Sequence, residues 1–88
     1  MFIHLGQETI VRKSEIIGIF DIENTTVSKK TRDFLNKSEK NKEVINVSYE
    51  LPKSFVVCNK KGTKQKKVYI SQISCSTLYK RSDFINKL

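Results

Sequence analysis

Two short apolar segments separated by a lysine-rich connection constrain the fold of this chain more than any other feature. Residues 54–58 (Ser-Phe-Val-Val-Cys) and 68–73 (Val-Tyr-Ile-Ser-Gln-Ile) are rich in β-branched and aromatic side chains, which is typical of β-strands. The nine residues between them, 59–67, contain five lysines and Gly62, and glycine readily adopts the positive φ of a hairpin tip. The pattern therefore predicts a hairpin with an apolar stem and a strongly cationic tip.

The first part of the chain predicts three more strands. Residues 2–5 and 9–11 are short apolar runs on either side of a turn at 6–8, and residues 15–22 form the most hydrophobic segment. Strict alternation along 15–22 would place Gly18 on the same face as the apolar side chains Ile16, Phe20 and Ile22.

The opposite face of this strand would carry Ile17 and Ile19. With apolar side chains on both faces, we expect the strand to be buried on both, by the core on one side and by a neighbouring subunit on the other. Gly18 lies in its middle, where glycine often marks the close approach of another element.

The second half of the sequence predicts two helices and one further strand. Ser28 is a candidate N-cap for a helix that runs to about Lys40, and its inner stripe would consist of Thr31, Phe34, Leu35 and Ser38. Residues 44–51 alternate between apolar and polar side chains, which predicts a half-buried antiparallel strand ended by Pro52. A last helix is predicted from Thr77 to about Asn86, with apolar side chains at Leu78, Phe84, Ile85 and Leu88.

These elements make residues 1–88 one domain of the α+β class. We expect a small antiparallel sheet of about six short strands with two short helices. A chain of 88 residues buries only about 60–65% of the surface that its unfolded form exposes, so its core is thin unless it oligomerises.

The charge of the chain favours a polyanionic partner. The net charge is +8, and residues 29–88 alone contain fifteen basic and five acidic side chains. Nucleic acid is the first candidate for such a partner and an anionic membrane surface is the second. The alternative is a lysine-rich surface that is merely solvated.

The sequence offers little for catalysis or for metal binding. His4 is the only histidine, and strand alternation places it on the face opposite Ile3 and Leu5, where a structural or surface role is expected. Cys58 and Cys75 form no CxxC pair, and neither lies in a nucleophile motif. No glycine-rich phosphate loop is present. We therefore expect no enzyme activity, metal, cofactor or small-molecule ligand.

Few cysteines and no segment resembling a signal peptide or a membrane span lead us to expect a cytoplasmic protein without a membrane partner. For nucleic-acid binding we expect phosphate contacts rather than base reading, because lysine is a flexible point charge. The candidate residues are the tip lysines, one lysine before the hairpin and a basic pair in an earlier turn: Lys60, Lys61, Lys64, Lys66, Lys67, Lys53, Arg12 and Lys13. The alternative is a solvated tip whose charges discourage edge-to-edge aggregation.

Four segments taken in order resemble the RemB branch of the RemA/RemB family, which are small bacterial regulators tied to extracellular-matrix and biofilm genes. They are Phe2–Gly6, Glu15–Asp21, Pro52–Val57 and Tyr69–Arg81. The resemblance covers nearly the whole chain and implies a cytosolic regulator. For the RemA branch it further implies a ring-shaped homo-oligomer that binds duplex DNA through outward basic residues and activates transcription.

The chain departs from the RemA pattern at the residues that contact DNA. The RemA branch carries adjacent arginines in the turn before the central strand, where this chain reads Glu-Leu-Pro-Lys at 50–53. A second RemA-type arginine falls at about Glu15. Those roles therefore do not carry over, and we hypothesise that the long lysine-rich connection at 59–67 replaces them. The remaining hypotheses are RNA binding and a protein-interaction module that assembles with a DNA-binding paralogue.

Overall fold

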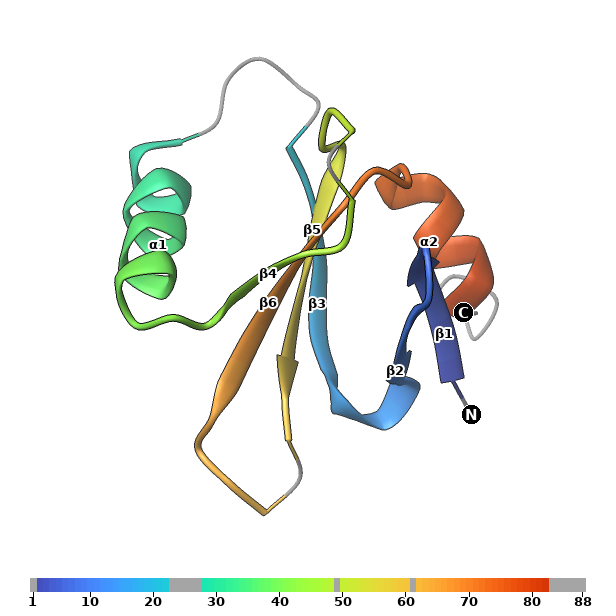
Figure 1. Ribbon diagram of the computed structural model, residues 1–88, viewed down its shortest axis with the longest axis horizontal. Helices are drawn as coiled ribbons and strands as arrows, with labels where there is room; N and C mark the ends of the chain where they lie inside the picture. The colour runs from blue at the N-terminus through green and yellow to red at the C-terminus, as the bar shows by residue number, and fades with distance from the viewer. Residues whose placement is uncertain (1, 23–27, 49, 61, 83–88) are drawn as a thin grey trace.

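Six strands and two helices form the structure, a computed structural model that describes residues 2–22, 28–48, 50–60 and 62–82 (Figure 1). The α+β class and the numbers of strands and helices are confirmed. In chain order the elements are β1 (Phe2–Gly6), β2 (Thr9–Arg12), a 3₁₀ turn (Lys13–Glu15), β3 (Ile16–Asp21), α1 (Lys29–Lys40), β4 (Val44–Asn46), β5 (Ser54–Asn59), β6 (Lys66–Ser71) and α2 (Cys75–Ser82).

The strands form two sheets where the sequence predicted one. Strands β1 and β2 pair with each other, and the other four lie in the order β3-β5-β6-β4. The predicted hairpin is confirmed, because β5 and β6 pair antiparallel from Ser54 opposite Ser71 to Asn59 opposite Lys66. Toward the tip, pairing continues one residue further than expected on β5 and two residues further on β6, so the connection between the two strands shortens to residues 60–65. Gly62 adopts a φ of 85° in that connection, as its type predicted.

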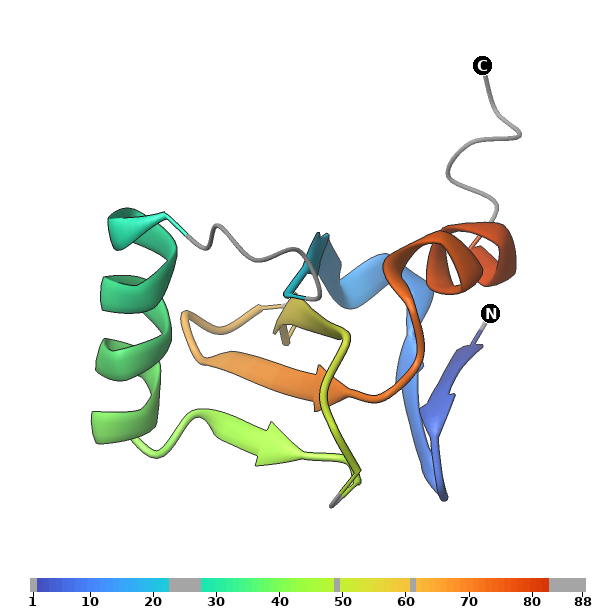
Figure 2. The same cartoon turned by 90° about the horizontal axis from the view of Figure 1, so that it is seen from above.

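Strand β5 separates two hydrophobic clusters, because its residues from Ser54 to Cys58 are all buried. Phe55 and Val57 pack on the α1 side with Val68. Val56 and Cys58 pack on the opposite side, against β1, β2 and α2. Figure 2 shows α1 on one side of the sheet and the β1–β2 pair with α2 on the other.

The predicted faces of β3 are wrong for Ile16 and Ile17. A β-bulge lies between Ile16 and Gly18, since Ile16 pairs with Cys58 and Gly18 already pairs with Val57. The extra residue reverses the alternation, so Ile16 packs on the cluster that contains Ile19, and Ile17 turns to the α1 side.

Strand β3 is also an edge strand, and only one of its faces is buried in the chain. Ile19 is buried, whereas Ile17 is 58% and Phe20 45% exposed. The group that comes close to Gly18 belongs to β3 itself and not to another element, because a Cβ there would lie 2.7 Å from two ring carbons of Phe20. The absence of a side chain at residue 18 therefore lets the Phe20 ring lie flat along the strand.

The strand predicted over 44–51 is shorter in the structure, and it runs parallel to its neighbour where an antiparallel strand was expected. Strand β4 ends at Asn46 and pairs parallel with β6. Because β6 lies between β4 and β5, the chain crosses the end of the sheet before it enters β5. Alternation shows that a strand is half-buried, but it does not identify the neighbour with which the strand pairs.

A serine stands directly before each helix, Ser28 before α1 and Ser74 before α2. Ser28 caps α1 by accepting a hydrogen bond from the Thr31 backbone N–H, and the four predicted inner residues are its least exposed ones. Helix α2 begins at Cys75, two residues before the prediction, and Leu78 is fully buried. Residues 83–88 lie outside the described part, and with them the predicted contacts of Phe84, Ile85 and Leu88.

Two buried serines join the central hairpin to the rest of the molecule. The Ser71 hydroxyl donates to the Leu5 carbonyl at 2.7 Å, which ties β6 to β1 of the other sheet. The Ser54 hydroxyl donates to the Ile73 carbonyl at 2.7 Å. Among the described residues, no helix is long and apolar enough to cross a membrane.

We predict that Ser71→Ala lowers the free energy of unfolding by about 1–3 kcal/mol, because it leaves the buried Leu5 carbonyl without its donor. Urea unfolding followed by circular dichroism measures the change. The control is Ser14→Ala at an exposed position, for which we expect a change within about 0.5 kcal/mol. Equal stability of the Ser71 variant and the wild type would contradict this account of how the sheets are joined.

Candidate nucleic-acid interface

Three basic side chains from separate segments line one depression of about 250 Å³ at the end of the central hairpin. Arg12 comes from the end of β2, Lys60 from the residue after β5, and Lys67 from β6. We call this surface the basic depression. Its other lining residues are Phe2, Ile10, Val11, Glu15, Cys58, Gln65 and Tyr69.

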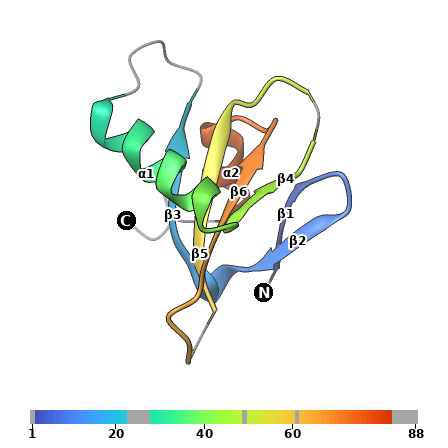
Figure 3. The same ribbon diagram turned by 60° about the vertical axis from the view of Figure 1, so that its left-hand side comes forward.

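Strand register explains why these residues converge. Lys67 pairs with Cys58, whose side chain packs in the cluster beneath β1 and β2, so Lys67 projects toward that side. Arg12 ends β2, where the chain turns toward β3. Figure 3 shows the β5–β6 connection projecting from one end of the molecule, close to the turn from β2 to β3.

Arg12 is positioned by two contacts. Its guanidinium carbon lies 5.7 Å from the centre of the Phe2 ring, which pairs with it across the strands. Its Nε atom lies 3.9 Å from Glu15 Oε1. Both partners leave the guanidinium largely exposed, and Glu15 is the single acidic residue among those that line the depression.

The other predicted site residues are placed in different ways. Lys13 starts the 3₁₀ turn next to Arg12, and Lys64 is exposed in the hairpin connection. Lys66 pairs with Asn59 and lines a groove on the α1 side. The neighbouring residues Lys66 and Lys67 therefore project to opposite faces of β6. Lys61 lies outside the described residues.

Lys53 lies at the other end of β5 from the basic depression. Its backbone N–H donates to the Ser71 carbonyl and its carbonyl accepts from the Ile22 N–H. The six residues of β5 separate it from Lys60, which corresponds to about 20 Å of extended chain. A single copy of the chain therefore does not bring Lys53 into the basic depression.

Sequence reasoning did not identify Phe2, Ile10, Glu15 or Tyr69 as neighbours of the basic residues. Alternation did place Phe2 on the outer face with His4, and both are exposed as expected. The missing information was the packing of the β1–β2 pair beside β5 and β6, because no local pattern specifies which sheet a short hairpin packs against.

The floor of the basic depression is poorly suited to nucleophilic chemistry. Burial, and then the negative charge of Glu15, raise the pKa of the Cys58 thiol to about 11. Burial, followed by the charges of Cys58 and Glu15, also raises the pKa of Tyr69. Within the described ranges, no group of three His, Cys, Asp or Glu side chains could hold a metal ion.

The fold and this surface define a small α+β domain with a cationic concave end, and comparison with known proteins gives its family. A model described as "RemA-like: Extracellular matrix regulatory protein A-like" matches residues 2–81. Extracellular matrix regulatory protein B of Bacillus subtilis is 39% identical over 85 residues, which cover 97% of this chain and 94% of that protein. The chain belongs to the RemA-like family of extracellular matrix regulatory proteins, and the resemblance seen in the sequence to its RemB branch is confirmed.

We predict that Cys58 reacts about 100-fold more slowly with iodoacetamide at mildly alkaline pH in the folded chain than in the chain unfolded by guanidinium. The reason is that the raised pKa keeps the thiol protonated, and the thiolate is the reactive form. Peptide mass spectrometry after timed alkylation gives both rates. Equal rates in the two states would contradict the burial of this thiol.

Proposed function

We propose that this chain is a non-enzymatic, DNA-binding regulator of extracellular-matrix genes that contacts the phosphate backbone through the basic depression and the adjoining hairpin tip. The observation that carries the proposal is the convergence of Arg12, Lys60 and Lys67 on one concave surface. Lys60 and Lys67 belong to the lysine-rich hairpin and Arg12 to β2, so their convergence on one surface results from the packing of the β1–β2 pair beside the hairpin.

The chemistry of the surface suits phosphate contact. Lysine ammonium groups neutralise phosphates without reading bases, and the Arg12 guanidinium adds a planar donor. Glu15 repels a phosphate on its side of the depression. Phosphates therefore bind over Lys60 and Lys67, and the exposed Lys64 of the hairpin connection and Lys13 of the 3₁₀ turn add positive charge nearby.

Assembly of several copies would strengthen such weak contacts. We propose that the chain forms a homo-oligomer, as the resemblance to ring-forming relatives implies, and that repeated depressions bind along one duplex. Exposed apolar side chains support assembly, and Leu51 is the most exposed of them at 85%. An assembly would also allow Lys53 of one copy to contribute to a site from which it is distant within its own chain.

A second candidate function is a protein-interaction module that assembles with a DNA-binding paralogue. The observation that favours it is Glu15, because a carboxylate in the basic depression weakens phosphate binding. In that case the lysines of the hairpin tip are solvated and keep the molecule from aggregating.

We predict that wild-type protein binds duplex DNA with an affinity that falls steeply with salt, by a slope of roughly −0.9 in log K against log[salt] for each phosphate neutralised. The triple variant Arg12→Ala, Lys60→Ala, Lys67→Ala should reduce the magnitude of this slope by roughly 2–3, because it removes three phosphate contacts. Fluorescence anisotropy across a salt series measures both slopes.

The matched control for this experiment removes the same charge from α1, through Lys29→Ala, Lys37→Ala and Lys40→Ala at exposed positions. It should leave most of the slope intact. Equal losses in the two triple variants would remove the basic depression from the site, and no binding by the wild type would favour the interaction module. A single-stranded RNA of the same length, titrated in parallel, distinguishes an RNA-binding protein.

We predict that light scattering at micromolar concentration gives a mass several times that of one 10.2 kDa chain. Increasing salt should leave this mass unchanged, because apolar contacts are much less sensitive to screening than exposed ion pairs. A strict monomer would contradict the proposed assembly while leaving phosphate contact by the single chain open to the anisotropy test.

A further inference from the structure

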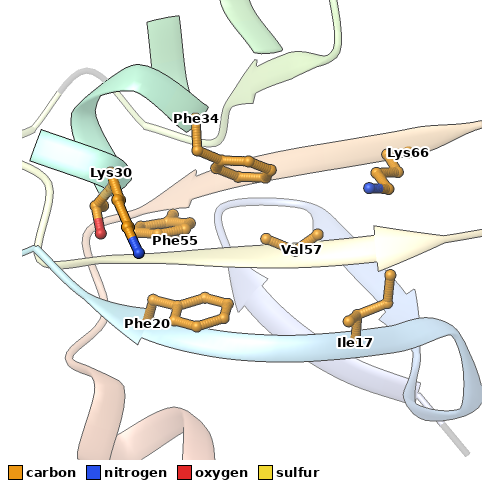
Figure 4. A pocket seen from close by; sticks show the side chains of 8 residues that line it. Ile17, Phe20, Lys30, Phe34, Phe55, Val57 and Lys66 are labelled. Carbon is orange, nitrogen blue, oxygen red and sulfur yellow. The ribbon is translucent and has the colours of Figure 1, made fainter. Parts of the chain in front are cut away.

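A second concave surface lies on the α1 side of the sheet, and the DNA-binding proposal does not use it. It is a groove of about 310 Å³ between α1 and the edge of the sheet, and we call it the aromatic groove. Phe20 from β3, Phe34 from α1 and Phe55 from β5 line it together with Ile17 and Val57, as Figure 4 shows. Its volume is close to the lower end of the range typical of small-molecule sites, roughly 300–1,000 Å³.

The aromatic side chains of the groove are held in place before any ligand arrives. The rings of Phe20 and Phe55 stack with centroids 4.9 Å apart and an interplanar angle of 18°. The Phe34 ring lies 6.4 Å from that of Phe55. Phe20 keeps this position because Gly18 leaves room for its ring. Phe20 is nevertheless 45% exposed, so this ordered apolar surface faces solvent.

The charged groups of the groove are all of one sign. Lys30 lies near Phe20 and Phe55, and Lys66 lies beyond Val57 toward the hairpin connection (Figure 4). No acidic side chain lines the groove, and within the described ranges neither lysine makes an ion pair. The remaining polar lining residue is Thr31. A ligand that buries an apolar body here can therefore place an acidic group beside an unpaired ammonium.

The neighbouring edge of β3 is less suited to an added strand. Ile22 N–H donates to the Lys53 carbonyl, so by antiparallel alternation the backbone groups of Ile19 point away from β5. The Ile19 carbonyl on that side accepts a hydrogen bond from the Tyr79 hydroxyl of α2 at 3.0 Å. The Tyr79 side chain thus occupies the hydrogen-bonding position at Ile19 that the backbone of an added extended peptide would need.

We propose that the aromatic groove binds a small anionic amphiphile, with an apolar chain or ring against the three phenylalanines and a carboxylate or similar acidic group beside Lys30 or Lys66. Charge complementarity and the size of the groove support this occupant. The site is separate from the basic depression, because Lys66 and Lys67 project to opposite faces of β6. The protein would then carry a ligand site on one face of its sheet and a phosphate-contacting surface on the other.

The test uses three probes with the same alkyl chain, namely octanoate, octanol and octylammonium, titrated by calorimetry into the full chain. Octanoate should bind once per chain and roughly 3–10-fold more tightly than octanol, and octylammonium should bind most weakly. The double variant Lys30→Gln, Lys66→Gln should reduce octanoate affinity to that of octanol. Both substitutions are at exposed positions, so circular dichroism should show an unchanged fold.

Lys67→Gln is the matched control, because it removes the same charge from the adjacent residue on the opposite face of β6, and it should leave octanoate affinity unchanged. Equal affinity for the three probes would overturn the proposal in favour of a plain hydrophobic patch. Equal losses in Lys66→Gln and Lys67→Gln would overturn it in favour of non-specific charge attraction. Absence of octanoate binding to the full chain would also overturn it.

Discussion

Strand β5 is buried on both faces, and this burial fixes the positions of the elements around it. Phe55 and Val57 face one hydrophobic cluster, while Val56 and Cys58 face the other. Because β6 pairs with β5 in a fixed register, this burial also decides where the hairpin lysines project. Lys66 pairs with Asn59 and Lys67 with Cys58, so the two side chains diverge to opposite sides. One lysine-rich segment thereby contributes to two concave surfaces that differ in character.

The basic depression exists only while the β1–β2 pair is docked beside the central hairpin. Arg12 belongs to that pair, and Lys60 and Lys67 belong to the hairpin. The buried hydrogen bond from Ser71 to the Leu5 carbonyl joins the two parts, and the apolar cluster around Ile3, Leu5 and Val56 supports it. We infer that the relative position of the cations is set by core packing and does not require a long ordered loop.

Local pattern predicted the features that depend on local chemistry. The hairpin stem, the Ser28 cap of α1 and the outward direction of His4 all follow from side-chain types and alternation. The bulge at Ile17 and the parallel pairing of β4 did not follow, because each depends on a partner strand distant in the sequence. The candidate site was predictable as a list of cations. The sequence did not predict that these cations divide among the basic depression, the groove on the opposite face and the distant position of Lys53. That division depends on the register between β5 and β6 and on the packing of β1 and β2 beside them.

We propose that DNA contacts the basic depression and not the lysine surface in general. Lysine acetylation read by mass spectrometry, with and without saturating duplex DNA, tests this proposal, since it reports each lysine separately and works for an oligomer of any size. We expect DNA to slow acetylation of Lys60 and Lys67 at least several-fold while Lys37 and Lys40 on α1 react at the same rate. Equal protection of all these lysines, or protection on α1 alone, would contradict the account.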